Sequence, residues 1–190
     1  MNKKAIEFPQ YSTQILQTLK EGRVLLVAEG KDGKPNPMTI AWGSIMFAWN
    51  KPIFVAMVRG SRHTYKLIEE SDSFTVNFFT AKYKKEMAFC GTKSGRDYDK
   101  FKETGLTPTS AKTVATPVIK EAFINVECKI VSKEKMDQQF LEKSIMDQYY
   151  SLDDTPGKDL HFFYFGEIVE MYKEEAQDDI IETVFKDNWL

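Results

Sequence analysis

The sequence GKPNPMTIAWGSIMFAWNKP (residues 33–52) begins with turn residues and then becomes strongly apolar. Asp32 precedes it, so the turn contains an Asp-Gly pair, which is a strong signal for a β-hairpin. We therefore predict that this turn joins a strand at 23–30 to a second strand around 37–42. Met38, Ile40 and Trp42 alternate along the second strand, so their side chains share one face.

That apolar face has two interpretations. Alternating apolar residues usually belong to a core, and periodicity alone favours this reading. The alternative is an apolar slot for a ligand, beside a strand whose backbone groups stay free at the rim of a sheet. The stretch contains no acidic residue. Trp49, farther along, is predicted to lie in the core.

Outward from this stretch, the same patterns predict about six strands in all, with short helices between them. The further strands are expected at 52–58, 74–79, 122–133 and 161–172, with a bulge or a close backbone approach at Gly166. Helices are expected at 11–21, ended by Gly22, at 63–71, with Ser61 as N-cap, and twice within 81–105, around a loop at 91–97.

Hairpins early in the chain and helices in its middle favour a mainly β fold, a closed or nearly closed antiparallel barrel. We expect a single domain over 1–190, with a C-terminal tail from about 173 that forms a helix or a packing arm. The strand at 122–133 alternates cleanly. Ile124, Val126 and Cys128 face one way and Asn125 and Glu127 the other, which predicts a half-exposed strand.

Composition excludes several classes of protein. A net charge of −2, with acids and bases mixed, gives no field that attracts nucleic acid or a membrane surface. No apolar run is long enough to span a bilayer and the N-terminus has no apolar signal core, so we expect a cytoplasmic protein. Cys90 and Cys128 form no redox motif and are expected to be buried or spare thiols. His63 and His161 are too few for a histidine-built metal site, so no metal is expected.

Two segments suit an anion. Residues 58–65 (VRGSRHTY) place Arg59, Arg62 and His63 around a helix start, with Ser61 and Thr64 as hydroxyl donors. Residues 90–101 (CGTKSGRDYDKF) combine small residues with cations, Arg96 and Lys100 among them. Together they suggest one phosphate approached by both segments. The alternative is a capped helix and two solvated charged loops.

No catalytic dyad or triad is recognisable. The serines lack the GxSxG elbow, and the sequence does not place an acid beside either histidine. Hydrolysis is therefore an unpromising activity.

The motifs NPMTIAWGS, RGSRHTYKLIEESDSFTVNF, CGTKSGRDYDKF and HFFYFGEIVEM, in this order and spacing, resemble the flavin reductase-like FMN-binding split-barrel family. The similarity covers roughly residues 15–172 and is nearest to the flavoredoxin group. The SGRDxDKF element is its most discriminating part.

The resemblance implies a homodimeric split β-barrel with one FMN per subunit near the dimer interface. It implies that the segment from Asn36 to Trp42 lines the isoalloxazine ring, through Met38, Thr39, Ile40, Ala41 and the side chain of Trp42. It assigns Arg59, Ser61, Arg62, His63 and Thr64 to the phosphate, with Lys100 or Arg96 as a further cation. Asn77 and Phe78 are weaker candidates near the flavin.

One feature departs from the family. In reductases that serve two-component monooxygenases, the late strand usually opens Gly-Asp-His, whereas this chain has Lys158-Asp159-Leu160-His161. The histidine is displaced by one position, so the use of NAD(P)H is an open question. The leading hypothesis is an FMN-binding oxidoreductase, in one of two forms, and a protein of a different class is the alternative. The three candidates are an NAD(P)H-dependent flavin reductase acting on free flavin, a flavoredoxin-like electron carrier with a redox protein partner, and a non-catalytic protein that binds another phosphorylated ligand or a protein.

Overall fold

The computed structural model describes residues 3–150 and 159–174. Its order of elements is β1 (Lys3–Ala5), α1 (Ser12–Lys20), β2 (Val24–Glu29), β3 (Pro35–Ile40), β4 (Gly43–Ala48), β5 (Lys51–Arg59), α2 (His63–Glu69), β6 (Ser73–Phe78), the 3₁₀ turn η1 (Ala81–Tyr83), α3 (Lys84–Thr92), α4 (Lys100–Thr104), β7 (Pro108–Thr109), β8 (Val118–Ile119), β9 (Ile124–Lys135), η2 (Gln138–Phe140), α5 (Lys143–Tyr149) and β10 (His161–Glu174).

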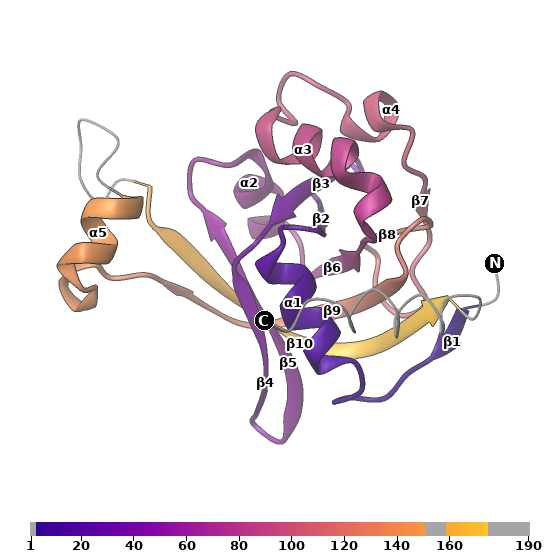
Figure 1. Cartoon of the computed structure of the whole chain (residues 1–190), viewed down its shortest axis with the longest axis horizontal. Coiled ribbons are helices and arrows are strands. Elements are labelled where there is room, and N and C mark those ends of the chain that lie inside the picture. Colours follow the sequence, from indigo (N-terminus) through magenta and orange to yellow (C-terminus); the bar gives the residue numbers. More distant parts are fainter. Residues whose placement is uncertain (1–2, 151–158, 175–190) are drawn as a thin grey trace.

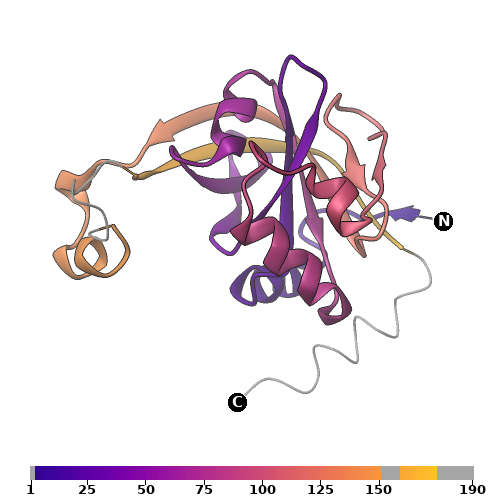
Figure 2. The same cartoon turned by 90° about the horizontal axis from the view of Figure 1, so that it is seen from above.

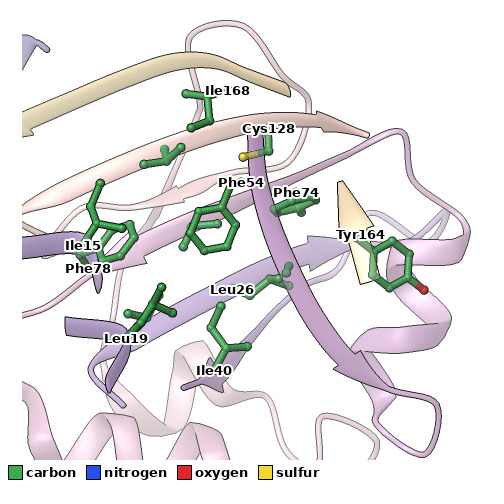
Figure 3. Packing of buried hydrophobic residues seen from close by; sticks show 14 of the residues in the cluster. Ile15, Leu19, Leu26, Ile40, Phe54, Phe74, Phe78, Cys128, Tyr164 and Ile168 are labelled. Atoms are coloured by element: carbon green, nitrogen blue, oxygen red, sulfur yellow. The ribbon is translucent and has the colours of Figure 1, made fainter. Parts of the chain in front are cut away.

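Eight of these strands form one antiparallel sheet, in the order β3-β2-β6-β9-β10-β5-β4, with β1 added on β10. The sheet curls around a core of side chains from both halves, including Leu26, Phe54, Phe74 and Phe78 (Figure 3). The strands β3 and β4 lie at the two ends of the path, so the barrel is split between them. The predicted mainly β, split-barrel fold is confirmed.

The first hairpin forms where the Asp-Gly signal places it. Gly33 has φ 68°, a conformation that favours glycine, and β2 pairs with β3 from Val24↔Ile40 to Glu29↔Pro35. Both faces of β2 are buried. Leu26 faces the barrel core, and Leu25 faces a second apolar cluster under α3 and α4.

A strand that the sequence analysis missed follows at once. β4 pairs with β5 through the two-residue turn Trp49-Asn50, in which both residues have positive φ (50° and 58°), as a type I′ turn requires. The prediction that Trp49 lies in the core is wrong. Its side chain is 61% exposed at the tip of this hairpin, against Phe165.

Glycines also confirm two other expectations. Gly22, with φ 65°, follows Glu21, the C-cap residue of α1, and ends the helix. The pairing of β10 with β9 shifts register between Phe165 and Gly166. A Cβ at Gly166 would meet Cys128 and Phe74 at 2.6 Å, so the two strands approach too closely there for any side chain.

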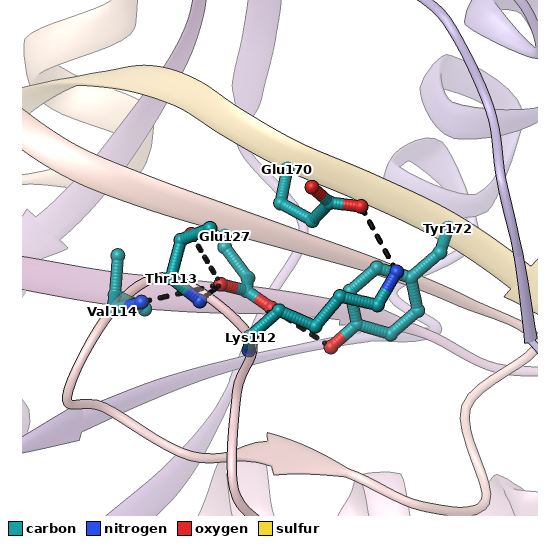
Figure 4. Close-up of polar contacts among 6 residues, drawn as sticks. All are labelled: Lys112, Thr113, Val114, Glu127, Glu170 and Tyr172. Atoms are coloured by element: carbon teal, nitrogen blue, oxygen red, sulfur yellow. Dashed lines mark hydrogen bonds and ion pairs between the residues drawn. The ribbon is translucent and has the colours of Figure 1, made fainter.

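The prediction of a half-exposed strand at 122–133 is wrong in one respect. The faces alternate as expected, but Asn125 and Glu127 are fully buried on the polar face. The chain segment between β7 and β8 covers Glu127. Its carboxylate accepts hydrogen bonds from the backbone N–H groups of Lys112 and Thr113, both at 2.7 Å, and from the Tyr172 hydroxyl at 3.0 Å (Figure 4).

Beyond the barrel, β9 and β10 extend together into an arm that carries η2 and α5 away from the body (Figures 1 and 2). None of α5, β1, β7 or β8 was predicted. The expected tail lies almost entirely outside the described residues, since 175–190 are not among them.

Glu127 provides a pH-dependent test of the fold. Burial opposes its ionisation, but the hydrogen bonds from Lys112, Thr113 and Tyr172 outweigh burial and hold the pKa of Glu127 below 4.5. A carboxyl group with a lowered folded-state pKa contributes stability above its unfolded pKa and loses that contribution as the pH falls. We therefore expect Glu127→Gln to lower the free energy of unfolding at pH 7 by about 2–3 kcal/mol, and by less as the pH falls below about 4.

The matched control is Glu170→Gln, which removes a partly exposed carboxylate paired with the Lys112 ammonium at 3.0 Å (Figure 4). An exposed ion pair contributes little, so this variant should change stability by less than about 1 kcal/mol. Denaturant titrations from pH 3 to pH 8 measure both variants. If the free energy of unfolding lost in Glu127→Gln did not depend on pH, the lowered pKa of Glu127 would be contradicted.

Candidate functional site

An apolar pocket opens at the split of the barrel. The connection between β3 and β4 forms one wall, and β5 and the start of β10 form the other. Its volume is about 180 Å³, and it is lined by Met38, Thr39, Ile40, Ala41, Trp42, Met57, Arg59, Arg62 and His161. The Trp42 ring lies against the rings of His161 and Tyr149, both with centroids 5.1 Å away.

A cationic pocket of about 110 Å³ adjoins it. Its walls come from β3, the start of α2, the end of α3 and the loop 93–99 before α4, namely Asn36, Met38, Ser61, Arg62, His63, Thr64, Cys90, Gly91, Thr92, Lys93, Ser94, Gly95, Arg96 and Lys100. Met38 and Arg62 line both pockets, which therefore form one groove. Among the described residues that line the two pockets, none is acidic. Apolar side chains gather at one end of the groove, with two arginines beside them, and cations dominate the other end.

Lys100 is the deepest charge of this groove. Its side chain is buried, and its ammonium donates hydrogen bonds to the carbonyl oxygens of Cys90, at 2.7 Å, and Pro37, at 3.1 Å. Burial, and then the positive charge of Arg62, lower the pKa of Lys100. No carboxylate of the described residues pairs with it. A buried ammonium held only by carbonyl dipoles favours a bound anion as its counter-charge.

The loop 93–99 is fixed close to β3 by packing that only glycine permits. A Cβ at Gly95 would overlap the Asn36 amide oxygen and would meet His63 Cδ2 at 2.8 Å. The Asn36 amide in turn donates to the Thr64 hydroxyl at 2.9 Å. These contacts bring the two anion-suited segments of the sequence together, as predicted. Burial and the charges of Arg96 and Lys100 lower the pKa of His63, which favours its neutral form.

The outer edge of β3 offers backbone groups to the apolar pocket. The Pro37 carbonyl bonds Lys100 and therefore points away from β2. Residues two apart along an antiparallel edge strand point the same way, so the backbone groups of Thr39 also face outward. The Thr39 hydroxyl is occupied, because it donates to the Met87 carbonyl of α3 at 2.6 Å.

Most predicted site residues gather along this groove. The apolar pocket contains Thr39, Ile40, Ala41, Trp42 and Arg59, the cationic pocket contains Asn36, Ser61, His63, Thr64, Arg96 and Lys100, and both contain Met38 and Arg62. Both interpretations of the opening stretch describe part of it, because Met38 and Ile40 pack in the barrel core and also border the groove, and Trp42 is 37% exposed.

Two predicted residues lie elsewhere. Asn77 and Phe78 are fully buried and line neither pocket. The Asn77 side chain accepts from the Ile119 N–H at 2.8 Å and from the Asn125 amide at 2.7 Å, so it joins β6 to β8 and β9. Phe78 packs in the barrel core beside Phe54. Their placement at the flavin is therefore corrected to a structural one.

Two details of the phosphate prediction are also corrected. The N-cap of α2 is Arg62, without a side-chain cap, and not Ser61. The Ser61 N–H already donates to Asp159 at 2.9 Å. Arg59 lines the apolar pocket, and its guanidinium donates to Asp159 at 3.4 Å and to the Tyr149 carbonyl at 2.9 Å. The Ser61 N–H and the Arg59 guanidinium therefore bind this chain itself, at the residues before β10 and at the end of α5.

Met57 and His161 line the apolar pocket but were not predicted as cofactor contacts. Met57 lies in a continuous apolar strand, where nothing in the sequence separates it from core residues. The sequence does not show that His161 reaches the pocket, because its position depends on the strand register that sets it opposite Arg59.

Cys90 lines the cationic pocket and is buried. Burial raises the pKa of its thiol to about 11. The expectation of buried thiols is confirmed for both cysteines. Within residues 3–150 and 159–174, no group of three or more His, Cys, Asp or Glu residues could hold a metal ion.

The sequence profile of the flavin reductase like domain matches residues 16–185. The chain belongs to this family. A flavoredoxin from Methanosarcina acetivorans is 31% identical, with a TM-score of 0.61 over 80% of this chain and 68% of that one. The FMN-binding domain of a flavin reductase-like enzyme from Shewanella baltica shares the fold, with a TM-score of 0.63 over 90% of this chain and 77% of that one, at 18% identity.

Among curated proteins, an uncharacterized protein of Archaeoglobus fulgidus is 32% identical over 63% of this chain. That match spans 66% of the relative, and two others span 61% and 51% of theirs, so the chain aligns with about half to two thirds of these proteins. In the described part of the chain, no helix has both the length and the apolar character needed to cross a membrane.

Proposed function

We propose that the protein is a redox flavoprotein that binds FMN in the groove between β3, β5 and the loop 93–99. The observation that carries this proposal is the polarity of the groove. Its apolar end, beside Trp42 and Met57, suits a flat ring, and its charged end suits a phosphate. Two similar structures, a flavoredoxin and an FMN-binding domain, support the same ligand class.

The residues present fit FMN on chemical grounds. Arg62, Lys93, Arg96 and Lys100 provide cationic donors for a phosphate dianion, and the buried ammonium of Lys100 lacks a carboxylate partner among the described residues. The outward backbone groups of Thr39 match the hydrogen-bonding edge of a flavin ring. Trp42 and Met57 would pack against its apolar part.

Bound flavin supplies the redox chemistry itself, since it accepts and donates hydride or single electrons. The chain's own residues bind the phosphate, orient the ring and exclude water from one side of it. This division of work explains why no catalytic dyad is needed.

The function has two candidate forms within this proposal. In one, the protein reduces flavin with NAD(P)H; in the other, it holds FMN tightly and exchanges electrons with a protein. The family membership supports the first form and the resemblance to a flavoredoxin the second. A non-catalytic protein that binds another phosphorylated ligand or a protein is the different-class alternative.

The visible spectrum of the purified protein, before and after addition of FMN, tests the proposal. We expect the absorption bands of bound flavin, with FMN identified by mass spectrometry. A preparation that stays colourless after addition of FMN and gel filtration would refute both redox forms.

Stopped-flow mixing of the FMN-bound protein with NADH and with NADPH then separates the reductase from the electron carrier. Bleaching by either supports the reductase, and bleaching only by a reduced iron–sulfur protein supports the carrier.

The phosphate end can be tested with Arg62→Ala. Arg62 is exposed and its side chain makes no hydrogen bond or ion pair with the described residues, so truncation of this side chain should not disturb the fold. A charge-assisted hydrogen bond to phosphate contributes enough that we expect the Kd for FMN to rise about tenfold or more. The Kd for riboflavin, which lacks the phosphate, should change by less than about threefold.

The control is Lys66→Ala, which removes an exposed cation of α2 that lines neither pocket. It should leave both affinities unchanged in fluorescence titrations. Equal losses of FMN and riboflavin affinity in Arg62→Ala would contradict the phosphate assignment.

We also propose a homodimer formed through the β4–β5 hairpin. β4 is an edge strand, and Met46, Phe47 and Trp49 on this hairpin are 39%, 62% and 61% exposed (Figure 1). An apolar edge of this kind is usually covered by another chain. A second copy is the partner that the family resemblance implies.

Light scattering coupled to size-exclusion chromatography tests the proposed homodimer. We expect wild type to be dimeric at micromolar concentration and the double variant Phe47→Glu, Trp49→Glu to be monomeric, because charges on an apolar interface are costly to bury. The control Phe140→Glu changes a residue on the arm that is 84% exposed and should preserve the dimer. The proposal would be contradicted if the wild-type protein were monomeric, or if Phe140→Glu were monomeric and the double variant were not.

A further inference from the structure

His161 is the first residue of β10 and lines the apolar pocket, although it is only 6% exposed. One side of its ring lies against Trp42. Its Nδ1 is 2.7 Å from the hydroxyl oxygen of Tyr150, the residue that follows α5 on the arm. Its Nε2 has no hydrogen-bond partner among the described residues. The imidazole therefore has one occupied and one available nitrogen.

The direction of the bond between Tyr150 and His161 follows from hydrogen-bond accounting. A phenol that accepted a proton from Nδ1 would need a second acceptor for its own hydrogen. No other acceptor within the described residues contacts the Tyr150 hydroxyl. Within the described residues Nδ1 is the acceptor that this hydroxyl reaches, so we assign the hydroxyl as the donor and Nδ1 as the acceptor. A neutral imidazole carries one N–H, so that hydrogen lies on Nε2.

Burial, more than the charges around the pair, favours the neutral form of both groups. Arg59 of β5 lies 5.0 Å from the centre of the Tyr150 ring, Arg62 lines the same pocket, and Asp159 precedes β10. Burial and the charge of Arg59 lower the pKa of His161 to about 4, against the opposing effect of Asp159. Burial raises the pKa of Tyr150, so its hydroxyl keeps its proton.

We propose that Tyr150 is a positioning residue that holds His161 as its Nε2–H tautomer, so that His161 offers a neutral donor to a carbonyl-type oxygen of a ligand in the apolar pocket. An imidazolium would favour an anion instead, and the opposite tautomer would favour a ligand N–H. The ligand class is therefore a ketone, aldehyde or carboxamide. Its identity as a second substrate beside flavin depends on the proposed function, but the tautomer is a property of the protein alone.

Nitrogen NMR of the purified full chain, labelled with ¹⁵N-histidine, tests the tautomer directly. The chain has two histidines, and His63→Gln assigns their signals. For His161 at pH 7 we expect a pyrrole-like Nε2 and a pyridine-like Nδ1. In the wild-type protein, signals averaged between the two tautomers, or a pyrrole-like Nδ1, would by themselves overturn the proposal.

Tyr150→Phe removes the hydroxyl and should shift both His161 signals toward averaged values. The control is Tyr149→Phe. Its ring contacts Trp42, but its hydroxyl makes no hydrogen bond with the described residues, so the tautomer should not change. An unchanged tautomer in Tyr150→Phe, in a protein whose amide spectrum remains folded, would also overturn the proposal.

Acetophenone and ethylbenzene, which differ in the ketone oxygen, test the ligand class on the protein as purified. Removal of the donor itself in His161→Phe should raise the Kd for acetophenone about five- to tenfold, while that for ethylbenzene changes less than about twofold. Tyr150→Phe, which only releases the tautomer, should raise the Kd for acetophenone by a smaller factor. Equal changes, or no acetophenone binding to wild type, would overturn the ligand assignment. Failure to bind FMN would refute the proposed function and leave the NMR result standing.

Discussion

The two ends of the sheet, β3 and β4, are consecutive in the sequence and are separated only by Ala41 and Trp42. This short connection forces the first and last strands of the hydrogen-bonded path to lie close together. The sheet must therefore curl into a barrel, yet the connection is not itself a strand pairing, so a split remains. The groove exists because of this constraint. Its floor is the connection, and the edge of β3 keeps backbone groups available beside it.

A second arrangement gives the groove its charge. Lys100 bonds the carbonyls of Cys90 and Pro37 and so ties α4 to α3 and β3 at the charged end. The same ammonium is both a structural tie and a source of positive potential. At the other end, Arg59 and Asp159 fasten the arm, and Tyr149 and Tyr150 reach Trp42 and His161. The groove is thus bounded by residues from almost the whole chain.

Much of this was predictable from sequence, for identifiable reasons. The β2–β3 hairpin has an Asp-Gly turn, and Gly22 and Gly166 mark a helix end and a close approach, because glycine is required where backbone conformation or spacing excludes a side chain. β4 was missed because its turn, Trp49-Asn50, lacks glycine. Trp49 was misplaced because an aromatic residue reads as core unless the turn is known. Asn77, Phe78 and Glu127 were misread because burial on both faces of a sheet depends on which distant segments cover it.

The sequence by itself determined the mainly β character of the fold, the hairpin at residue 33, the two anion-suited segments and the likeness to a flavin-binding family. These are local properties, set by backbone conformation, residue period and charge. Only the tertiary structure decided that the Met38–Trp42 stretch lines a pocket as well as the core, that Lys100 lacks a carboxylate partner among the described residues, and that Tyr150 meets His161. Those contacts join residues far apart in the chain, and strand register fixes them, which no short window of sequence contains.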